Sequence, residues 1–423
     1  MAEMKDSGVA WLGDIQNNWK LSKISNIYEL RIQKVSDKDY PPLSVTMNGI
    51  VPQLDSAAKT NAHDDRKLVK KGDFVINSRS DRRGSCGVSG SDGSVSLINT
   101  VMKPREEMNS DYYNWLFHTV QFADEFYKWG HGIVDDLWTT NWQNMKHIDI
   151  PVPALTVQKK IADYLNKRIP EIDVLHSDIK QQIETLEEYK KSIITEAVTK
   201  GLNPNAEMKD SGIEGIGLIP ANWKIKRAKY IADSLSKGYG ITKEDVLEDG
   251  NIQCVRYGDI YSKYDSTLVK CVSMTNAERI SSPKYIAKGD ILFAGTGELV
   301  EEIGKNVVYM GDEPCLAGGD IVVMEHSENP IFLNYAMNSL YSQQQKSKGK
   351  AKLKVVHISA TDIGNILVVL PPINEQKEIA KLLDIKCSEI NKAIADKKQQ
   401  LETLIQYKKS LIYEYVTGKK EVL

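Results

Sequence analysis

Two stretches of the 423-residue chain gather basic and polar side chains at a density that suits binding to a polyanion. The first, NSRSDRRGS, sets arginines beside serines and an asparagine, and these groups donate hydrogen bonds to phosphates and base edges. The second, KSKGKAKLK, concentrates lysines. The candidate nucleic-acid contacts in the two stretches are Asn77, Ser78, Arg79, Ser80, Arg82, Arg83, Lys346, Lys348, Lys350 and Lys352.

A basic run is more often only a solvated surface. Two such runs in corresponding halves of one chain nevertheless favour nucleic acid. The loop KWGHG lies where the first half aligns with the lysine run, so Lys128 and His131 are further candidates.

The segment FAGTG, from Phe293 to Gly297, follows an apolar run and matches the short glycine pattern of S-adenosylmethionine-dependent methyltransferases. We reject that interpretation, because a five-residue pattern is common and the equivalent first-half segment, VINSRSD, lacks the glycines. No catalytic Asn/Asp-Pro-Pro-Tyr/Phe tetrapeptide follows it either. A hairpin turn accounts for the two glycines, with Thr296 as another candidate DNA contact.

Other catalytic patterns are missing from the sequence. It contains no G-x-x-x-x-G-K-S/T phosphate loop and no zinc-ligand spacing among its histidines and cysteines. Glu-x-Lys pairs such as Glu188 and Lys190 fall on a charged helical stretch and indicate a solvated face. We therefore expect a binding protein without catalytic or metal-ligating residues. A self-contained adenine methyltransferase using FAGTG and a coiled-coil scaffold without a DNA role are the alternatives.

Composition restricts the class of protein further. The 55 Lys and Arg residues face 57 Asp and Glu, a net charge of -2, so any polyanion site must be a local patch. The five cysteines show no paired spacing, which favours reduced thiols. Neither a membrane-spanning run nor a signal pattern is visible. These features predict a cytoplasmic protein with no membrane partner.

The elements that must position the candidate residues occur twice. The stretch from Pro153 to Thr199 returns without a gap from Pro371 to Thr417, so that PALTVQKKIADYL becomes PPINEQKEIAKLL. An independent repeat opens each half, where MKDSGVAWLGDIQNNWK recurs as MKDSGIEGIGLIPANWK. Trp19 and Trp223 are expected to be buried anchors in the two copies. The order of front element, variable region and helix therefore occurs twice.

Each long repeat predicts one helix, because its apolar residues recur at spacings of three, four and seven. Pro170 is expected to begin the first helix and Ser388 to cap the second. The stretch from Pro170 to Thr199 would then span roughly 45 Å. Neither narrow, charged helix is stable alone, so each is expected to pair with the other, although two separate surface helices are the alternative. The pairing positions are Ile172, Ile179, Ile183, Leu186, Ile193, Ile394, Leu401, Leu404 and Leu411.

The regions between the repeats predict strands and hairpins, because short apolar runs alternate with turn residues. A shared Lys-Gly-Asp, at 71–73 and 288–290, predicts the same turn entering an equivalent strand. The stretch 111–126 and the stretch that begins at Pro330 each predict one helix. Elsewhere the two regions diverge. Two readers of different ligands and relaxed drift of loops both account for that divergence.

Taken together, these motifs resemble the DNA-specificity subunits of type I restriction-modification systems. The opening MKDSGVAWLGDI, the KGD turn, LPPINEQKEIAKLLD and the closing YKKSLIYEYVTGK look like hallmarks of that family, and they recur over nearly the whole chain. The first copy departs from the usual Glu-Gln junction, since Val157 stands where the second copy has Glu375.

The resemblance implies an α/β (α+β) fold with two target-recognition domains, each containing a mixed, twisted sheet. Two long helices packed as an antiparallel coiled coil would separate them, and a pseudo-twofold axis would relate the halves. Recognition domains are expected at residues 1–152 and 204–370, and conserved spacer helices at 153–203 and 371–423.

The resemblance also implies a non-catalytic subunit that binds double-stranded DNA at an asymmetric bipartite site, with one half-site per domain. Two methyltransferase subunits would bind around the helices and methylate adenine, and restriction (motor) subunits would add ATP-dependent cleavage. S-adenosylmethionine, ATP and Mg would belong to those partners, so this chain itself is expected to hold no cofactor.

Overall fold

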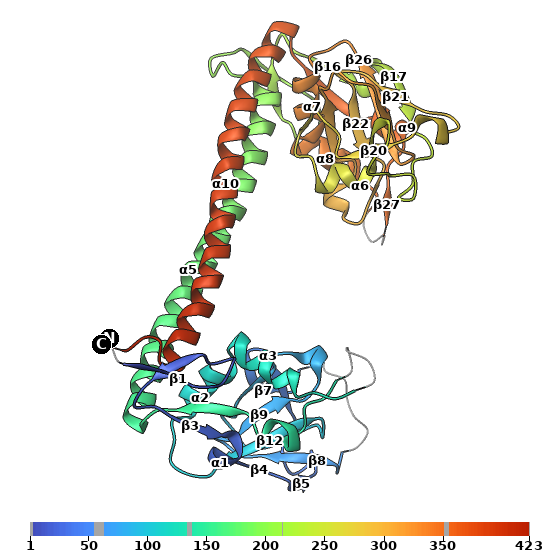
Figure 1. The fold of residues 1–423 in the computed structure, drawn as a ribbon. Coiled ribbons are helices and arrows are strands. Elements are labelled where there is room, and N and C mark those ends of the chain that lie inside the picture. Colours follow the sequence, from blue (N-terminus) through green and yellow to red (C-terminus); the bar gives the residue numbers. More distant parts are fainter. Residues whose placement is uncertain (1–2, 55–62, 133–137, 214, 351–354, 423) are drawn as a thin grey trace. The chain divides into compact units, whose positions relative to one another are not determined.

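The computed structural model describes residues 3–54, 63–132, 138–213, 215–350 and 355–422. The chain divides into two compact units (Figure 1). Unit 1 comprises Met1–Lys180 and Lys398–Leu423, and unit 2 comprises Gln181–Lys397. No helix among the described residues is long and apolar enough to cross a membrane.

Unit 1 contains a four-stranded sheet in the order β10-β9-β12-β4, a three-stranded sheet in the order β11-β8-β5, and three strand pairs. Its described ladders are antiparallel, and a single parallel bridge joins Pro42 to Ser94. The strands are β1 (Met4–Asp6), β2 (Asp14–Gln16), β3 (Lys20–Lys23), β4 (Tyr28–Leu30), β5 (Lys34–Val35), β6 (Leu43–Thr46), β7 (Gly49–Pro52), β8 (Arg66–Val69), β9 (Phe74–Asn77), β10 (Cys86–Val88), β11 (Gly93–Val95), β12 (Asn99–Pro104) and β13 (Asp149–Val152). The short helices are α1 (Ile24–Ile27), η1 (Ser80–Arg82), α2 (Ser110–Phe117), α3 (Val120–Lys128) and α4 (Trp142–Met145).

Unit 2 contains a five-stranded sheet in the order β17-β26-β22-β24-β19, a four-stranded sheet in the order β20-β18-β25-β21, and three strand pairs. Both sheets are mixed, because β18 pairs with β25 and β19 with β24 in parallel. The strands are β14 (Met208–Asp210), β15 (Leu218–Pro220), β16 (Lys224–Arg227), β17 (Ala232–Lys237), β18 (Ile252–Val255), β19 (Thr267–Leu268), β20 (Ser273–Thr275), β21 (Tyr285–Ile286), β22 (Ile291–Ala294), β23 (Thr296–Gly297), β24 (Asn306–Tyr309), β25 (Cys315–Ala317), β26 (Ile321–His326), β27 (Val356–His357) and β28 (Leu367–Leu370). The short helices are η3 (Ala228–Tyr230), α6 (Tyr257–Ser262), η4 (Ala277–Arg279), η5 (Val300–Glu302), α7 (Pro330–Asn338), α8 (Leu340–Ser347) and α9 (Ala360–Gly364).

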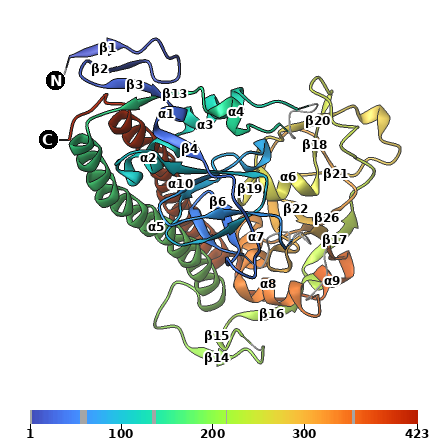
Figure 2. The same ribbon diagram turned by 90° about the horizontal axis from the view of Figure 1, so that it is seen from below.

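The two long helices, α5 (Leu155–Lys200) and α10 (Ile373–Val416), run antiparallel and side by side within each unit (Figures 1 and 2). In unit 1 the rings of Tyr164 and Tyr415 lie 4.5 Å apart, and Asp173 pairs with Lys408 further along the helices. In unit 2 Lys190 donates to Asn391 at 2.8 Å. Ile172, Ile179, Ile183, Ile394 and Leu411 are buried, and Leu186, Ile193, Leu401 and Leu404 are half-buried.

The predicted start of the first helix at Pro170 is wrong, because α5 already begins at Leu155 and carries Pro170 inside it. Ser388 likewise lies inside α10. An interior proline costs a helix about 3 kcal/mol, but Leu165 and Ile169 before it bury their side chains in the core of unit 1. That burial keeps the helix continuous through Pro170. At 1.5 Å per residue, its 46 residues span about 69 Å, longer than the sequence-based expectation.

The single helix predicted in each variable region is two helices in the structure. In unit 1 the break falls between α2 and α3, where Thr119 Oγ1 accepts a hydrogen bond from the Phe122 N–H and caps α3. In unit 2 it falls between α7 and α8 at Ser339, which has extended backbone angles. Apolar periodicity continues across both breaks, so the pattern did not reveal them.

The same contacts recur in both copies of the front element. Lys5 Nζ donates to the carbonyl oxygen of Trp19 at 2.8 Å, and Lys209 Nζ donates to that of Trp223 at 2.7 Å. The indole side chains are 2% and 1% exposed, which confirms that both tryptophans are buried anchors. The predicted Lys-Gly-Asp turns are also confirmed, since Gly72 and Gly289 adopt positive φ angles just before β9 and β22.

One exchange separates the two copies at these tryptophans. Trp223 Nε1 donates to Glu375 Oε2 at 2.8 Å, whereas Val157 occupies the equivalent position in the first copy. Among the described residues, the buried Trp19 Nε1 consequently has no hydrogen-bond acceptor. An unsatisfied buried donor costs about 1–3 kcal/mol.

We therefore predict that Val157→Glu stabilises unit 1 by about 1 kcal/mol, because the new carboxylate accepts from Trp19 Nε1. Glu375→Val should destabilise unit 2 by about 1–3 kcal/mol, and Glu375→Gln, which keeps an acceptor, should cost less. Denaturant unfolding of the full chain, followed by tryptophan fluorescence, measures all three. Destabilisation by Val157→Glu as large as that by Glu375→Val would contradict the explanation.

Candidate nucleic-acid interface

Unit 1 has a cleft of about 610 Å³, which we call the arginine cleft. Four arginines and one aspartate line it, so its walls carry excess positive charge. Its charged and polar lining includes Arg66, Asn77, Arg79, Asp81, Arg82, Arg83, Ser85 and Asn99. A concave, positively charged surface with hydrogen-bond donors suits a nucleic-acid backbone and its base edges.

Three of these arginines lie on the loop that joins β9 to β10. Arg79 Nε donates to Asp81 Oδ1 at 2.9 Å, and Arg83 pairs with Asp124. The side chains of Arg79, Arg82 and Arg83 remain 43%, 67% and 51% exposed. Their guanidinium groups are therefore partly oriented by carboxylates and still accessible to a ligand.

Arg66, which lines the cleft, and Ser78, which does not, both have structural roles. Arg66 is buried and donates from Nε to Ser94 Oγ at 2.8 Å, and burial lowers the pKa of its guanidinium. Ser78 is 4% exposed, and its hydroxyl lies 3.2 Å from that of Thr100. The prediction of Ser78 as a DNA contact is contradicted by this burial, because alternation along the chain turns Ser78 inward after Asn77. Ser80 begins η1 and is half-buried.

The structure brings the predicted KWGHG loop next to the arginine loop. Thr139 exchanges backbone hydrogen bonds with His131, each 3.1 Å long, and also forms a bridge with Arg79. The His131 side chain is exposed, and that of Lys128 is 70% exposed while pairing with Glu125 at 3.5 Å. His131 therefore joins the arginine loop through Thr139.

The lysine run in unit 2 behaves differently from its prediction. Lys346 is 1% exposed, and its ammonium donates to Gly304 O at 2.7 Å and to Asn306 Oδ1 at 2.9 Å. The prediction of Lys346 as a DNA contact is wrong for the folded chain, because α8 turns this lysine into the core. Lys348 is exposed, Lys350 donates to His357 O at 2.6 Å, and Lys352 lies outside the described residues.

The FAGTG segment does not contain the hairpin turn that we expected. Phe293 and Ala294 end β22, Gly295 lies between the strands, and Thr296 and Gly297 form β23. A Cβ on Gly295 would meet Asp320 O at 2.9 Å, and one on Gly297 would meet Tyr261 Oη at 2.8 Å. The backbone of Asp320 therefore requires a glycine at position 295, whereas at position 297 the end of the Tyr261 side chain would have to move. Thr296 is half-buried, and its Oγ1 lies 3.0 Å from His357 Nδ1.

A second basic cleft, of about 720 Å³, lies in unit 2 and was missed in the sequence. We call it the glycine cleft, because its lining includes Gly238, Gly240, Gly258, Gly318 and Gly319. Its charged and aromatic side chains are those of Lys237, Tyr239, Lys243, Arg256, Tyr257 and Asp320. Cations and partly exposed tyrosines around a backbone floor suit phosphates and stacked bases.

The glycines allow backbone segments to meet at the floor of this cleft. A Cβ on Gly238 would lie 2.1 Å from Gly318 O, so no side chain fits there. The local sequences SKGYG and VRYGD, each with a basic residue, a tyrosine and a glycine close together, were the available signal. We missed them because neither forms a dense basic run.

A smaller cavity of about 360 Å³ adjoins the glycine cleft and shares Lys237 and Asp320 with it. These two residues form an ion pair of 3.5 Å. His357 also lines the smaller cavity, so the Thr296–His357 pair lies beside the glycine cleft.

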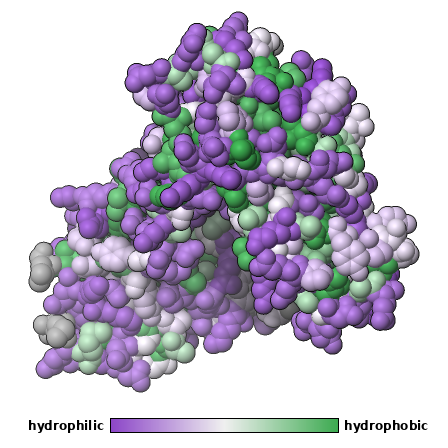
Figure 3. Space-filling view, turned by 90° about the horizontal axis from the view of Figure 1, so that it is seen from above, coloured by the Kyte–Doolittle hydropathy of each residue, from purple (hydrophilic) through white to green (hydrophobic). Residues whose placement is uncertain are grey.

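The face drawn in Figure 3 is mostly hydrophilic, with smaller hydrophobic groups among the polar residues. The described residues contain no cluster that could hold a metal ion.

Comparison with known proteins identifies the family that carries this arrangement. The family profile described as type I restriction modification DNA specificity domain matches residues 16–185 and 220–403, which is most of the chain and one match for each half. The chain belongs to this family. It is a type I restriction-modification specificity subunit with two recognition domains.

Individual relatives agree with that assignment. This chain is similar to the type I restriction enzyme MjaVIII specificity subunit of Methanocaldococcus jannaschii, with 26% identity over 342 residues. The aligned region covers 78% of this chain and 76% of that relative. The chain is also 26% identical over 290 residues to the putative type I restriction enzyme MjaX specificity subunit of the same organism, covering 67% of this chain and 61% of that protein.

Two solved structures share the fold. One, described as "Structural basis underlying complex assembly and conformational transition of the type I R-M system", matches with a TM-score of 0.73 at 13% identity over 96% of this specificity subunit and 99% of that chain. The HsdS subunit from Thermoanaerobacter tengcongensis matches with a TM-score of 0.54 at 16% identity over 96% and 98%. The expected fold, two α/β recognition domains with two long antiparallel helices, is confirmed.

The glycine cleft yields a matched pair of substitutions. Gly238→Ala should destabilise unit 2 by about 1–3 kcal/mol, because the new methyl group must displace the Gly318 carbonyl. Gly258→Ala should leave stability unchanged or raise it by up to about 1 kcal/mol, since Gly258 lies in α6, where alanine is preferred, and no atom beyond its own helix and chain neighbours lies within 4 Å of its Cβ position. Denaturant midpoints of the two variants measure the difference, and equal midpoints would show that the close backbone approach at Gly238 is not a constraint.

Because Lys346 is buried, we predict that the free energy of unfolding depends on pH. Desolvation lowers its pKa to about 7 in the folded chain, whereas an unfolded lysine titrates near pH 10.4. Between these values only the unfolded state holds the proton, so the free energy of unfolding should rise with pH from about 7 to about 10. Lys346→Met should flatten that rise, in unfolding experiments at pH 7 and pH 9. Parallel pH profiles of the two proteins would contradict the assignment.

Proposed function

We propose that this specificity subunit reads an asymmetric, two-part site on double-stranded DNA, with the arginine cleft of unit 1 and the glycine cleft of unit 2 each reading one half-site. The observation that carries this proposal is a duplicated frame with a different basic cleft in each copy. In both copies of the frame a lysine donates to the carbonyl oxygen of the buried tryptophan, Lys5 to Trp19 and Lys209 to Trp223. Divergent clefts on a repeated frame suit two unlike half-sites better than two copies of one.

The polar composition of the clefts supports sequence readout in addition to phosphate binding. Arginine binds guanine through two hydrogen bonds, and asparagine binds adenine in the same way. Arg82 and Asn77 bring these groups to the arginine cleft, while Tyr239 and Tyr257, 51% and 39% exposed, offer aromatic faces in the glycine cleft. Lys348 and Lys128 have exposed side chains and would contact phosphates.

We further propose that the chain acts without catalytic residues of its own, in a cytoplasmic complex with two methyltransferase subunits and with restriction subunits. Exposed apolar side chains on the long helices, including Val174 and Leu175 of α5 and Tyr407 of α10, support docking of methyltransferase subunits there. S-adenosylmethionine, ATP and Mg would belong to the partners. Chemistry would then reside in the partners and the choice of site in this chain.

Removing two arginine charges tests the proposal. Arg82→Ala with Arg83→Ala should weaken discrimination at one half-site by about 1–3 kcal/mol, because we expect these arginines to make bidentate base contacts. Discrimination at the other half-site should persist. The measurement is competition binding of the complex to DNA with substitutions in either half-site.

A matched control removes the same charge outside the cleft. Lys103 and Arg105 both pair with Glu29 and do not line the arginine cleft. Changing both to Ala should weaken binding to all sequences equally, if at all. Equal loss at both half-sites in the Arg82/Arg83 variant would argue against independent readers. A wild-type complex without salt-dependent DNA binding would favour a scaffold instead.

A further inference from the structure

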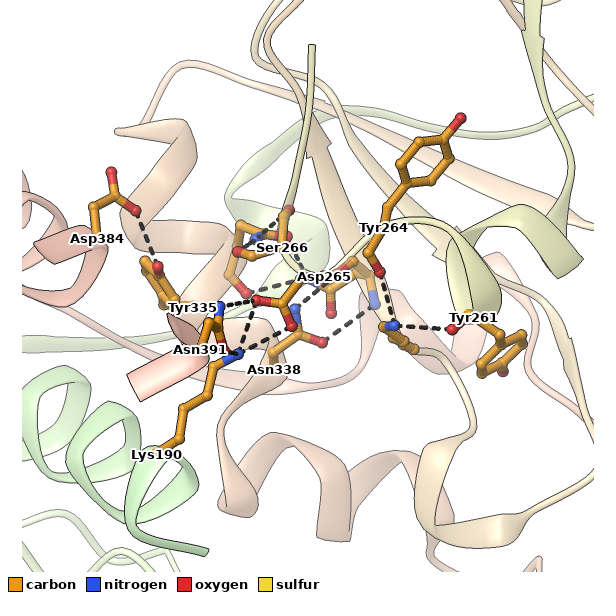
Figure 4. A network of polar contacts seen from close by, with 12 residues as sticks. Lys190, Tyr261, Tyr264, Asp265, Ser266, Tyr335, Asn338, Asp384 and Asn391 are labelled. Atoms are coloured by element: carbon orange, nitrogen blue, oxygen red, sulfur yellow. Dashed lines mark hydrogen bonds and ion pairs between the residues drawn. The ribbon is translucent and has the colours of Figure 1, made fainter. Parts of the chain in front are cut away.

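A three-way polar contact joins both long helices to the recognition fold of unit 2 (Figure 4). Lys190 of α5 donates from Nζ to Asp265 at 2.8 and 3.0 Å and to Asn391 Oδ1 of α10 at 2.8 Å. Asn391 Nδ2 closes the triangle with Asp265 Oδ2 at 2.7 Å. Asp265 lies on the loop between α6 and β19, so three separate elements meet at one ammonium group.

Among the described residues, the equivalent positions of the first copy lack this three-way contact, so it is not a feature that every part of the helix pair requires. The positions equivalent to Lys190 and Asn391 in the other copy are Lys408 and Asp173, and these two form a direct ion pair in unit 1. In unit 2 the helix supplies an amide in place of that carboxylate. The negative partner of Lys190 comes from the recognition fold, as Asp265.

Charge is retained at the contact. Burial raises the pKa of the Asp265 carboxyl, but the hydrogen bonds from Lys190 and Asn391 and the Lys190 charge outweigh burial and lower it overall. The carboxylate is therefore ionised at neutral pH. The Lys190 side chain is 17% exposed and that of Asp265 is 59% exposed, so the ammonium is largely covered while solvent still reaches the carboxylate.

The contact continues into the recognition fold through buried amides. Ser266, next to Asp265, accepts from Asn334 Nδ2 at its hydroxyl, 2.8 Å away. Asn334 Oδ1 accepts from Asn306 Nδ2 at 2.8 Å, and Asn306 Oδ1 accepts from Lys346 Nζ at 2.9 Å. Asn334 and Asn306 are fully buried. Satisfied buried networks of this kind hold their elements in one arrangement.

We propose that Lys190 is a positioning residue for DNA reading: by binding Asp265 and Asn391 together, it fixes the recognition fold of unit 2 on the helix pair and thereby sets how the glycine cleft meets its half-site. This inference rests on the proposed function. Lys190 does not line either cleft. Its effect on recognition is transmitted through Asp265 and the buried amides behind it.

The repeat supplies an experiment that separates positioning from simple helix pairing. In the double variant Asp265→Asn with Asn391→Asp, the carboxylate moves from the recognition fold to α10 and recreates the Lys408–Asp173 arrangement. Lys190 then still forms an ion pair with position 391 of α10, but it no longer forms one with position 265 of the recognition fold. If Lys190 only pairs the helices, this variant behaves as wild type.

The test uses the full chain co-expressed with its methyltransferase subunit. Methylation rates are measured on DNA with the wild-type site, with a base change in either half-site, and with a spacer altered by one base pair. Lys190→Met should reduce discrimination at the unit 2 half-site, or against the altered spacer, on the order of three- to tenfold. Unit 1 discrimination should be unchanged, and Lys190→Arg should retain most of the effect of lysine. The double variant should match wild type in melting temperature. It should lose part of the discrimination, though less than Lys190→Met, because the amide at position 265 can still accept a hydrogen bond from Lys190 but no longer carries a charge.

Lys408→Met is the matched control. It removes the equivalent lysine of unit 1, so it should lower the melting temperature without changing discrimination at the unit 2 half-site. Wild-type discrimination in the double variant would overturn the proposal, as would wild-type discrimination in Lys190→Met. If Lys190→Met fails to assemble, Asp265→Asn alone, which changes one atom, gives the same comparison. A wild-type complex that shows no site preference would refute the proposed function rather than this inference.

Discussion

The structure depends on burying one narrow apolar stripe along each of two long helices. Neither α5 nor α10 has enough apolar surface to be stable alone, and each carries charged residues around most of its circumference. Each unit resolves this by packing the helices against each other and against its own core, through Ile172 and Leu411 in unit 1 and Leu383 and Cys387 in unit 2. The recognition folds are consequently built onto the helix pair.

That constraint explains which parts of the two copies remained alike. Residues that join a recognition fold to the helices recur, as with Gln158 and Gln376, each of which accepts from the N-cap residue of a domain helix, Asn109 or Asn329. The two clefts do not join the recognition folds to the helices in this way, and they are lined by different segments of the two units. The repeated scaffold can therefore carry two different clefts, provided that each recognition fold keeps its contacts with the helices. The Lys190–Asp265 contact and the Trp223–Glu375 hydrogen bond show that individual contacts between a recognition fold and the helices differ between the copies.

Much of this arrangement could be predicted from the sequence, because repetition and helical periodicity are properties of whole segments. The duplicated frame, the buried tryptophans and the Lys-Gly-Asp turns belong to that class. Individual side chains were harder to predict. The basic run made Lys346 look exposed, yet α8 turns it toward buried acceptors. Pro170 looked like a helix start because local preference does not register the core that holds α5 together. The glycine cleft assembles residues such as Lys237 and Arg256 from separate segments, so no single stretch revealed it.

The most direct measurement is a genome-wide map of adenine methylation in a host that expresses this chain with its methyltransferase subunit, compared with the same host lacking the chain. The account predicts a new, asymmetric motif with two specified halves and an unread spacer, present only when the chain is expressed. It also predicts that base substitutions in the two halves act independently. A palindromic or continuous motif, or no new motif from an assembled complex whose methyltransferase is active, would contradict the assignment of one half-site to each unlike cleft.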